Sequence, residues 1–139
     1  MYDVYENTVR FEETDAQGVV FYGNYVTYQD ETFTAYLAAI GLEYETIMAE
    51  DWDFRVVNVE LNYRGSAKFP DRLENAMRVV AINESSIEFD YECRRGADGE
   101  LLADGSVTYV VVSDGTPRRV PDDVRDAVVE FQDTPPDPV

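Results

Sequence analysis

The sequence of 139 residues contains no histidine. This absence excludes a Ser-His-Asp triad, a Cys-His dyad and any metal site built on imidazole. Cys93 is the only cysteine, so the chain forms neither an internal disulfide nor a zinc site of several thiolates. Acid–base chemistry would therefore have to come from Asp, Glu, Tyr, the single lysine (Lys68) or a bound cofactor.

Basic residues are scarce as well. Eleven Lys and Arg stand against 29 Asp and Glu, which gives a formal net charge of −18, and ten of the eleven basic residues are arginine. Such a chain repels nucleic acid and anionic membranes, so we expect neither as a partner. An Asp-rich, lysine-poor composition is typical of a halophilic protein, because salt screens repulsion between carboxylates. An acidic protein of an ordinary cytoplasm is the alternative.

Long hydrophobic runs and targeting signals are also missing. The N-terminus has no basic start followed by an apolar stretch, and no segment approaches the ~20 apolar residues of a membrane-spanning helix. The length fits one domain, and 45% hydrophobic residues can build its core. We expect a single cytoplasmic domain over residues 1–131 and a disordered, proline-rich tail over residues 132–139.

The hydrophobic pattern predicts an α+β fold. Alternation over residues 5–12 indicates a half-buried strand, and apolar spacings of three and four over residues 24–40 indicate a long, substantially buried helix. Further patterns predict a short helix at 44–50, strands at 57–63, 72–82, 87–93 and 101–112, and a closing helix at 121–131. This order suggests an antiparallel sheet of about five strands packed around the long helix.

Asp15 is the strongest catalytic candidate. It lies just before the long helix, whose N-terminus presents unpaired N–H groups and a partial positive charge. Such a helix end can stabilise an oxyanion, while a nearby carboxylate attacks the carbonyl or activates water. The alternative is structural, because Asp15-Ala16-Gln17-Gly18 is also a good β-turn sequence.

The segment from Asp15 to Tyr25, DAQGVVFYGNY, resembles the active-site segment of the 4-hydroxybenzoyl-CoA thioesterase-like family of hot-dog proteins. The resemblance continues in residues 8–15 (TVRFEETD), 39–42, 56–70 and 117–121. It implies a hot-dog fold, in which a curved antiparallel sheet wraps a long helix, and hydrolysis of an acyl-CoA thioester to free acid and CoA. Asp15 would be the base or nucleophile, and the backbone N–H near Tyr22 would bind the thioester carbonyl.

The resemblance also implies how the rest of the site is built. Residues expected to line the substrate are Gly18, Val19, Phe21, Asn24, Tyr25, Asp30 and Glu31. For Asp30 and Glu31 the alternative is an exposed or interfacial strip of the helix. Tyr22 stands where many members carry histidine, so any role of an imidazole is lost. We expect no metal and no cofactor, and a homo-oligomer, most simply a homotetramer built as a dimer of dimers.

An acyl-CoA substrate needs cationic contacts for its phosphates. Arg64 and Lys68 flank the loop after the second predicted strand and are the candidates; they could equally be surface charges that balance nearby carboxylates. The second functional hypothesis is a non-catalytic acyl-CoA binding protein on the same fold. A hydratase is disfavoured, because that chemistry uses an Asp–His pair.

The charge leads to the first prediction. Because ~1 M salt shortens the Debye length to ~3 Å, the chain should be folded in molar salt and lose structure as the salt is removed. Circular dichroism at low and molar salt measures this directly. A fully folded spectrum without added salt would contradict the salt-adapted interpretation.

Overall fold

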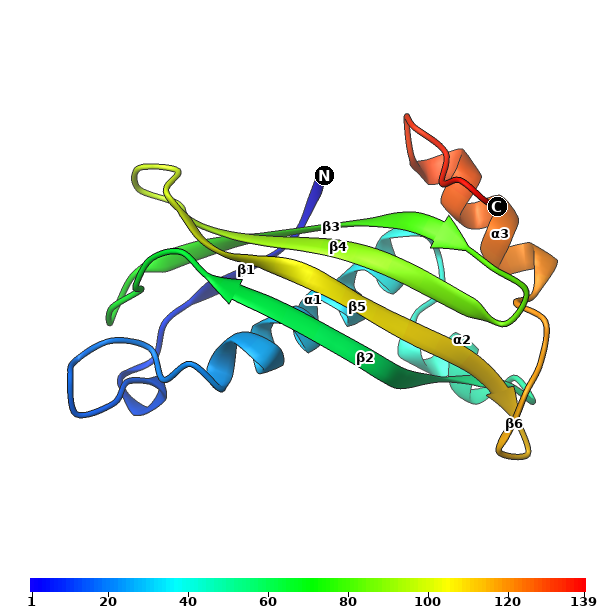
Figure 1. Ribbon diagram of the computed structural model, residues 1–139, viewed down its shortest axis with the longest axis horizontal. Coiled ribbons are helices and arrows are strands. Elements are labelled where there is room, and N and C mark those ends of the chain that lie inside the picture. The colour runs from blue at the N-terminus through cyan, green and yellow to red at the C-terminus, as the bar shows by residue number, and fades with distance from the viewer.

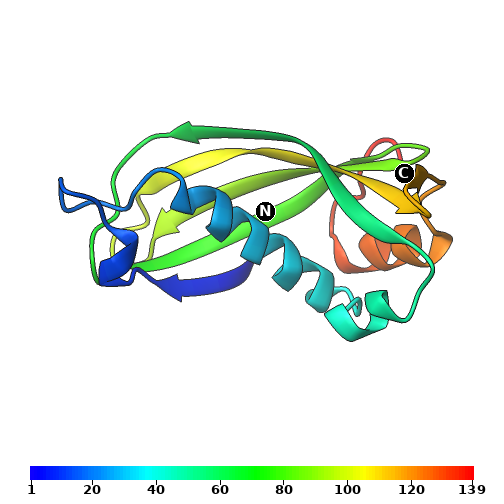
Figure 2. The same cartoon turned by 90° about the horizontal axis from the view of Figure 1, so that it is seen from below.

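A curved antiparallel sheet lies over one long helix in the computed structural model, which describes residues 1–139 (Figures 1 and 2). The strand order is β1-β3-β4-β5-β2, and the short β6 pairs with β5. The elements are β1 (Tyr2–Thr8), the 3-10 helix η1 (Phe11–Glu13), α1 (Asn24–Ala39), α2 (Tyr44–Met48), β2 (Asp53–Tyr63), β3 (Arg72–Ile82), β4 (Ser86–Arg95), β5 (Leu101–Ser113), β6 (Thr116–Pro117) and α3 (Asp122–Phe131). The predicted α+β architecture is therefore confirmed. No helix has the length and hydrophobicity that crossing a membrane requires.

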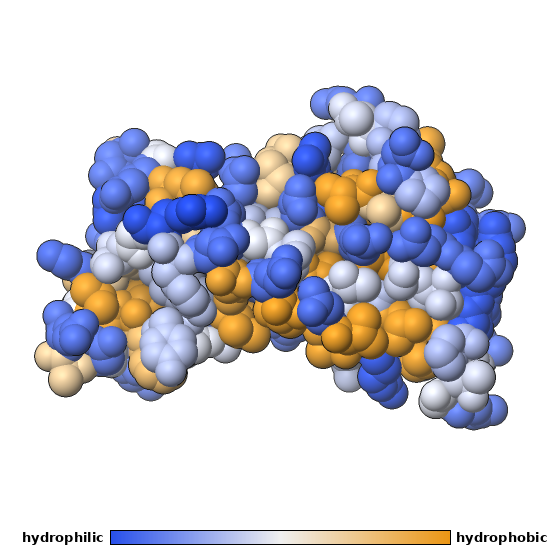
Figure 3. Space-filling model, in the orientation of Figure 1, coloured by the Kyte–Doolittle hydropathy of each residue, from blue (hydrophilic) through white to orange (hydrophobic).

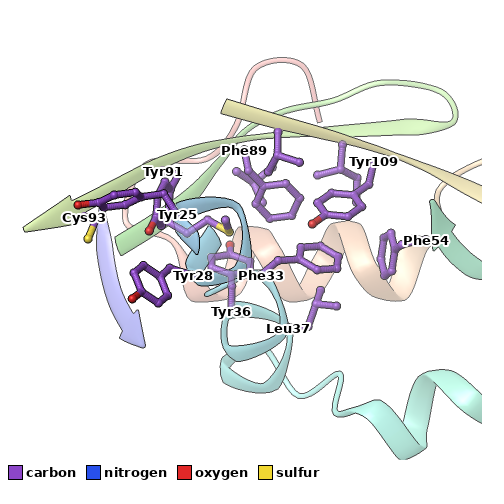
Figure 4. Packing of buried hydrophobic residues seen from close by; sticks show 14 of the residues in the cluster. Tyr25, Tyr28, Phe33, Tyr36, Leu37, Phe54, Phe89, Tyr91, Cys93 and Tyr109 are labelled. Atoms are coloured by element: carbon purple, nitrogen blue, oxygen red, sulfur yellow. The ribbon is translucent and has the colours of Figure 1, made fainter. Parts of the chain in front are cut away.

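The core forms where the inner face of the sheet meets one side of α1. Phe33 of α1 stacks on Tyr109 of β5 with ring centroids 3.8 Å apart, and meets Phe54 and Phe89 edge-on at 5.4 Å (Figure 4). Burying a side chain of this size stabilises the fold by ~2–3 kcal/mol, and each aromatic pair adds ~1 kcal/mol. This aromatic contact fixes α1, and with it the start of the helix, relative to the sheet.

The structure corrects three details of the predicted pattern. The first strand ends at Thr8, because the chain turns into η1 and leaves Phe11 exposed to 74%. The long helix is buried only on the side of Tyr25, Phe33 and Leu37, whereas its opposite side, with Val26 44% exposed, faces outwards. β2 begins at Asp53, four residues earlier than the pattern predicted.

The C-terminal segment 132–139 was expected to be disordered, but the structure places it against β3. The side chain of Gln132 is buried, and its Oε1 accepts hydrogen bonds from Val79 N–H and Tyr36 Oη, both at 2.7 Å. Its Nε2 donates to the carbonyl of Val79 at 3.1 Å. Further along, the N–H of Asp137 donates to Val80 O and the N–H of Ile82 donates to Pro138 O. The segment therefore covers the end of β3 that β1 does not reach.

The hydrogen bonds of Gln132 should contribute measurably to stability. Gln132→Ala should lower the free energy of unfolding by roughly 2–4 kcal/mol, because it leaves the buried polar groups of Val79 and Tyr36 without partners. Glu130→Ala, at an exposed position of α3, is the matched control and should change stability by less than about 0.5 kcal/mol. Equilibrium denaturation of both variants measures the difference. Equal effects would show that the segment contributes nothing specific.

Candidate active site

Asp15 lies at the start of a short loop, residues 14–20, that closes on itself through a bridge between Thr14 and Val20. The N–H of Gly18 donates to Asp15 O, and the N–H of Gln17 donates to Asp15 Oδ1 at 2.8 Å. Gly18 adopts φ +78°, which favours glycine. Asp15 can therefore hold the turn and still act as a catalyst. Its Oδ1 holds the turn, whereas its Oδ2 accepts no hydrogen bond within the chain.

The loop leads directly into the N-terminus of α1. The N–H groups of Asn24, Tyr25 and Val26 donate to carbonyls of residues 21–23. The N–H groups of Tyr22 and Gly23 donate to no group of the chain. No acidic side chain lies in the first turn of α1 to neutralise the positive end of the helix dipole. This helix start therefore offers two consecutive N–H donors to an external acceptor.

Glu13 connects the Asp15 loop to α1. Its Oε1 accepts hydrogen bonds from Arg10 N–H at 2.9 Å and from Tyr28 Oη at 2.8 Å. Burial alone would raise the pKa of Glu13, but the hydrogen bonds from Arg10 and Tyr28 outweigh it and hold the pKa below its usual value. Burial and the bond to Glu13 raise the pKa of the Tyr28 hydroxyl. The sequence prediction missed Glu13; its only signal was a carboxylate three residues after Arg10.

The remaining candidates of the segment lie around this start of the helix. Tyr25 is buried, and its hydroxyl accepts the N–H of Ala67 at 3.4 Å. Asn24 donates from Nδ2 to Glu13 O at 2.8 Å, so it holds the loop. Phe21 and Gly18 are exposed, and Val19 is half-buried.

The loop between β2 and β3 lies against the Asp15 loop, because the N–H of Val20 donates to Ala67 O at 2.9 Å. This brings both candidate cations to the same end of the molecule. Arg64 forms an ion pair with Asp104 at 3.3 Å, whereas the amine of Lys68 forms no ion pair or hydrogen bond. Of the two cations, Lys68 is therefore the one whose charge no carboxylate of the chain pairs with.

Asp30 and Glu31 point to different parts of the surface. Asp30 lines a cavity of about 430 Å³ between α1, α2 and β2, where burial, followed by the charge of Asp30, raises the pKa of Tyr109. Glu31 lies towards β1, where burial, followed by the charge of Glu31, raises the pKa of Tyr5. Neither Asp15 nor Tyr22 lines the cavity. Within one chain, the structure thus does not bring the two helix carboxylates together with Asp15.

Cys93 of β4 is fully buried beside Tyr91 (Figure 4). Burial raises the pKa of its thiol to about 11. The thiol is therefore protonated at neutral pH and closed to solvent, so Cys93 is a small residue of the core rather than a nucleophile.

The thioesterase-like superfamily model matches residues 9–128 of the chain. Acyl-CoA thioester hydrolase YbgC of Escherichia coli is 29% identical over 126 residues, which cover 89% of this chain and 91% of that protein. The 1,4-dihydroxy-2-naphthoyl-CoA hydrolase of Synechococcus elongatus is 24% identical over 119 residues, with 84% and 86% covered.

Solved structures give the same result for the fold. The hypothetical protein TT1821 from Thermus thermophilus superimposes with a TM-score of 0.86 at 28% identity, over 94% of this chain and 99% of that one. A 1,4-dihydroxy-2-naphthoyl-CoA thioesterase from Synechocystis gives 0.84 at 22% identity, over 94% and 97%. The fold is thus the hot-dog fold of thioesterases. The chain belongs to the thioesterase-like superfamily, and it is an enzyme of the thioester hydrolase class.

Proposed function

We propose that this protein hydrolyses acyl-CoA thioesters with Asp15 as base or nucleophile and with the N–H groups at the start of α1 as the oxyanion site. One observation carries the assignment. A single short segment, residues 15–23, presents a carboxylate oxygen without a hydrogen-bond partner and two consecutive unpaired N–H groups. Acyl-CoA is also the substrate that the names of the E. coli and Synechococcus relatives state.

The reaction needs one negative charge stabilised and one proton moved. As a base, Asp15 takes a proton from water while the oxygen of that water bonds to the thioester carbon. The carbonyl oxygen becomes an oxyanion and accepts hydrogen bonds from the N–H groups of Tyr22 and Gly23. When the C–S bond breaks, its electron pair leaves on sulfur, and CoA departs as a thiolate that takes up the proton that Asp15 removed from water. As a nucleophile, Asp15 instead bonds to the carbon itself, and water then hydrolyses the anhydride.

The absence of histidine fits this chemistry. Thiols have pKa values near 8.5, so a thiolate is a much better leaving group than an alkoxide or an amine. The C–S bond can therefore break without a strong general acid on the sulfur. A carboxylate and backbone N–H groups suffice for the step that remains, the addition to the carbonyl.

The contacts to CoA are proposed for Arg64 and Lys68. Their loop lies against the Asp15 loop through the bond between Val20 and Ala67, so a CoA held at the helix start would pass near both cations. The net charge of −18 repels the phosphates over the rest of the surface, which makes a local positive site necessary. The amine of Lys68 is free to bind a phosphate, whereas the guanidinium of Arg64 would have to bind the phosphate and Asp104 together.

We also propose that two copies of the chain join along β2, and that two such dimers form a tetramer. β2 is an edge strand of 11 residues, with backbone groups unpaired on its outer side. Its apolar residues Val56, Val57 and Val59 are exposed to 55%, 61% and 40%, and Figure 3 shows apolar side chains gathered along β2. Long exposed apolar edge strands pair with another strand. At its end, Tyr63 donates a hydrogen bond to Tyr22 O, so this edge borders the proposed site.

A charged residue on the exposed edge of β2 should prevent the proposed pairing of two chains. Val57→Lys should break the pairing along β2 and lower the mass of the assembly, because a lysine would be buried there without a partner. Val129→Lys, on an exposed position of α3, is the control and should leave the mass unchanged. Light scattering after size exclusion in molar salt measures the mass. A monomeric wild-type protein under these conditions would refute the dimer.

Replacing the carboxylate of Asp15 by an amide tests its role as base or nucleophile. Asp15→Asn should reduce the release of free thiol from acyl-CoA esters by about 10²-fold or more, because the amide keeps the turn but neither accepts the proton nor attacks. Asp98→Asn is a matched control, since Asp98 Oδ1 also accepts the N–H two residues later, at 3.0 Å against 2.8 Å for Asp15. That variant should stay within about threefold of the wild type.

The assay uses a panel of aromatic, short and long acyl-CoA esters in high salt. A wild-type rate in Asp15→Asn would remove Asp15 from the mechanism. Tight acyl-CoA binding without turnover across the whole panel would instead favour the non-catalytic binding protein.

A further inference from the structure

Glu13 accepts five hydrogen bonds, two on its backbone carbonyl and three on its carboxylate. Its backbone carbonyl accepts Phe21 N–H at 2.9 Å and Asn24 Nδ2 at 2.8 Å. Its carboxylate accepts Arg10 N–H, Arg10 Nε and Tyr28 Oη at 2.9, 3.2 and 2.8 Å. One residue thus joins three pieces of the chain: the end of η1, the exit of the Asp15 loop and the first two turns of α1.

The burial of this carboxylate distinguishes it from its neighbour. The side chain of Glu13 is 14% exposed, whereas that of Glu12, which also pairs with Arg10, is 72% exposed. An exposed ion pair contributes little, but a carboxylate held by three donors and largely shielded from water is fixed in place. Glu13 is therefore a rigid connection, and Glu12 is an ordinary surface charge.

The Asp15 loop needs such a connection. Ala16, Gln17 and Gly18 at its tip are exposed, and no residue of the tip packs in the core. Its neck is held by the Thr14–Val20 bridge and by the hydrogen bonds of Glu13. The unpaired N–H groups of Tyr22 and Gly23 lie between Phe21, which is hydrogen-bonded to Glu13, and the first residue of α1.

We propose that Glu13 is a positioning residue, which fixes the carboxylate of Asp15 relative to the N–H groups of Tyr22 and Gly23. The inference rests on the proposed function, in which these groups act on one thioester carbonyl. Catalytic groups must be held to within about 0.5 Å, and a displacement of about 1 Å can cost 10²-fold in rate. Loss of Glu13 should therefore slow the chemical step and leave the binding of CoA, which occurs elsewhere, nearly unchanged.

Steady-state kinetics test the proposal. Glu13→Ala should lower kcat by about 10- to 100-fold while KM changes by less than about threefold. Glu13→Gln should recover most of the rate, because its Oε1 can still accept Tyr28 Oη and Arg10 N–H. Glu12→Ala is the matched control and should match the wild type. A kcat of Glu13→Ala equal to that of Glu12→Ala would overturn the proposal.

A double mutant shows whether Glu13 acts through Asp15. On the Asp15→Asn background, Glu13→Ala should cause no further loss of rate, because no carboxylate remains to be positioned. A further loss as large as that in the wild-type background would overturn the proposal. Tyr28→Phe removes only one hydrogen bond of Glu13, so it keeps the test decisive if Glu13→Ala does not fold. It should lower kcat by at least about threefold, and an unchanged kcat would contradict the proposed role.

Amide hydrogen exchange separates this proposal from the proposed function. The N–H groups of Asp15 and Gly18 are hydrogen-bonded within the loop. In Glu13→Ala, or in Tyr28→Phe if that variant does not fold, they should exchange at least about tenfold faster than in Glu12→Ala. Equal exchange would refute Glu13 as the anchor, even if the enzyme is active. Faster exchange in a protein without thioesterase activity would refute the proposed function and leave the anchoring role standing.

Discussion

The contact between the aromatic side of α1 and the inner face of the sheet determines where the functional groups of this protein lie. Phe33 stacks on Tyr109 and meets Phe54 and Phe89 edge-on. These contacts fix both the rotation of the helix about its axis and its position relative to the sheet. The start of the helix is thereby held at one end of the sheet, beside the loop between β2 and β3. The Asp15 loop, which has no core contacts at its tip, takes its position from the buried Val20 at its end and from this helix through Glu13.

Two shortages in the composition shape the proposed chemistry. Without histidine, a carboxylate and backbone N–H groups have to act on the carbonyl, and a thioester permits this because its leaving group is a thiolate. With a net charge of −18, the surface opposes an anionic substrate everywhere except near a few cations. The loop that carries Arg64 and Lys68 is next to the Asp15 loop, which is where a CoA substrate would need them.

The sequence predicted what depends on local pattern. β3 has the predicted limits, 72–82, because its apolar residues and the flanking turns are both local signals, and the Asp15–Gly18 turn is present for the same reason. The roles of Glu13 and Gln132 could not be predicted, since their partners Tyr28 and Val79 lie 15 and 53 residues away in the chain. The exposure of one side of α1 was missed because its small apolar residues look the same in a core and at an interface.

If the start of α1 receives the thioester carbonyl, a bound acyl-CoA must place that carbonyl against the N–H groups of Tyr22 and Gly23. The protein would be titrated with a non-hydrolysable acyl-CoA analogue that keeps the carbonyl, and the amide resonances would be followed by NMR. The N–H signals of Tyr22 and Gly23 should shift most strongly and become protected from exchange. If these two signals stay unchanged while those around Asp30 and the cavity between α1 and α2 shift, the thioester carbonyl binds elsewhere and the start of α1 is not the oxyanion site.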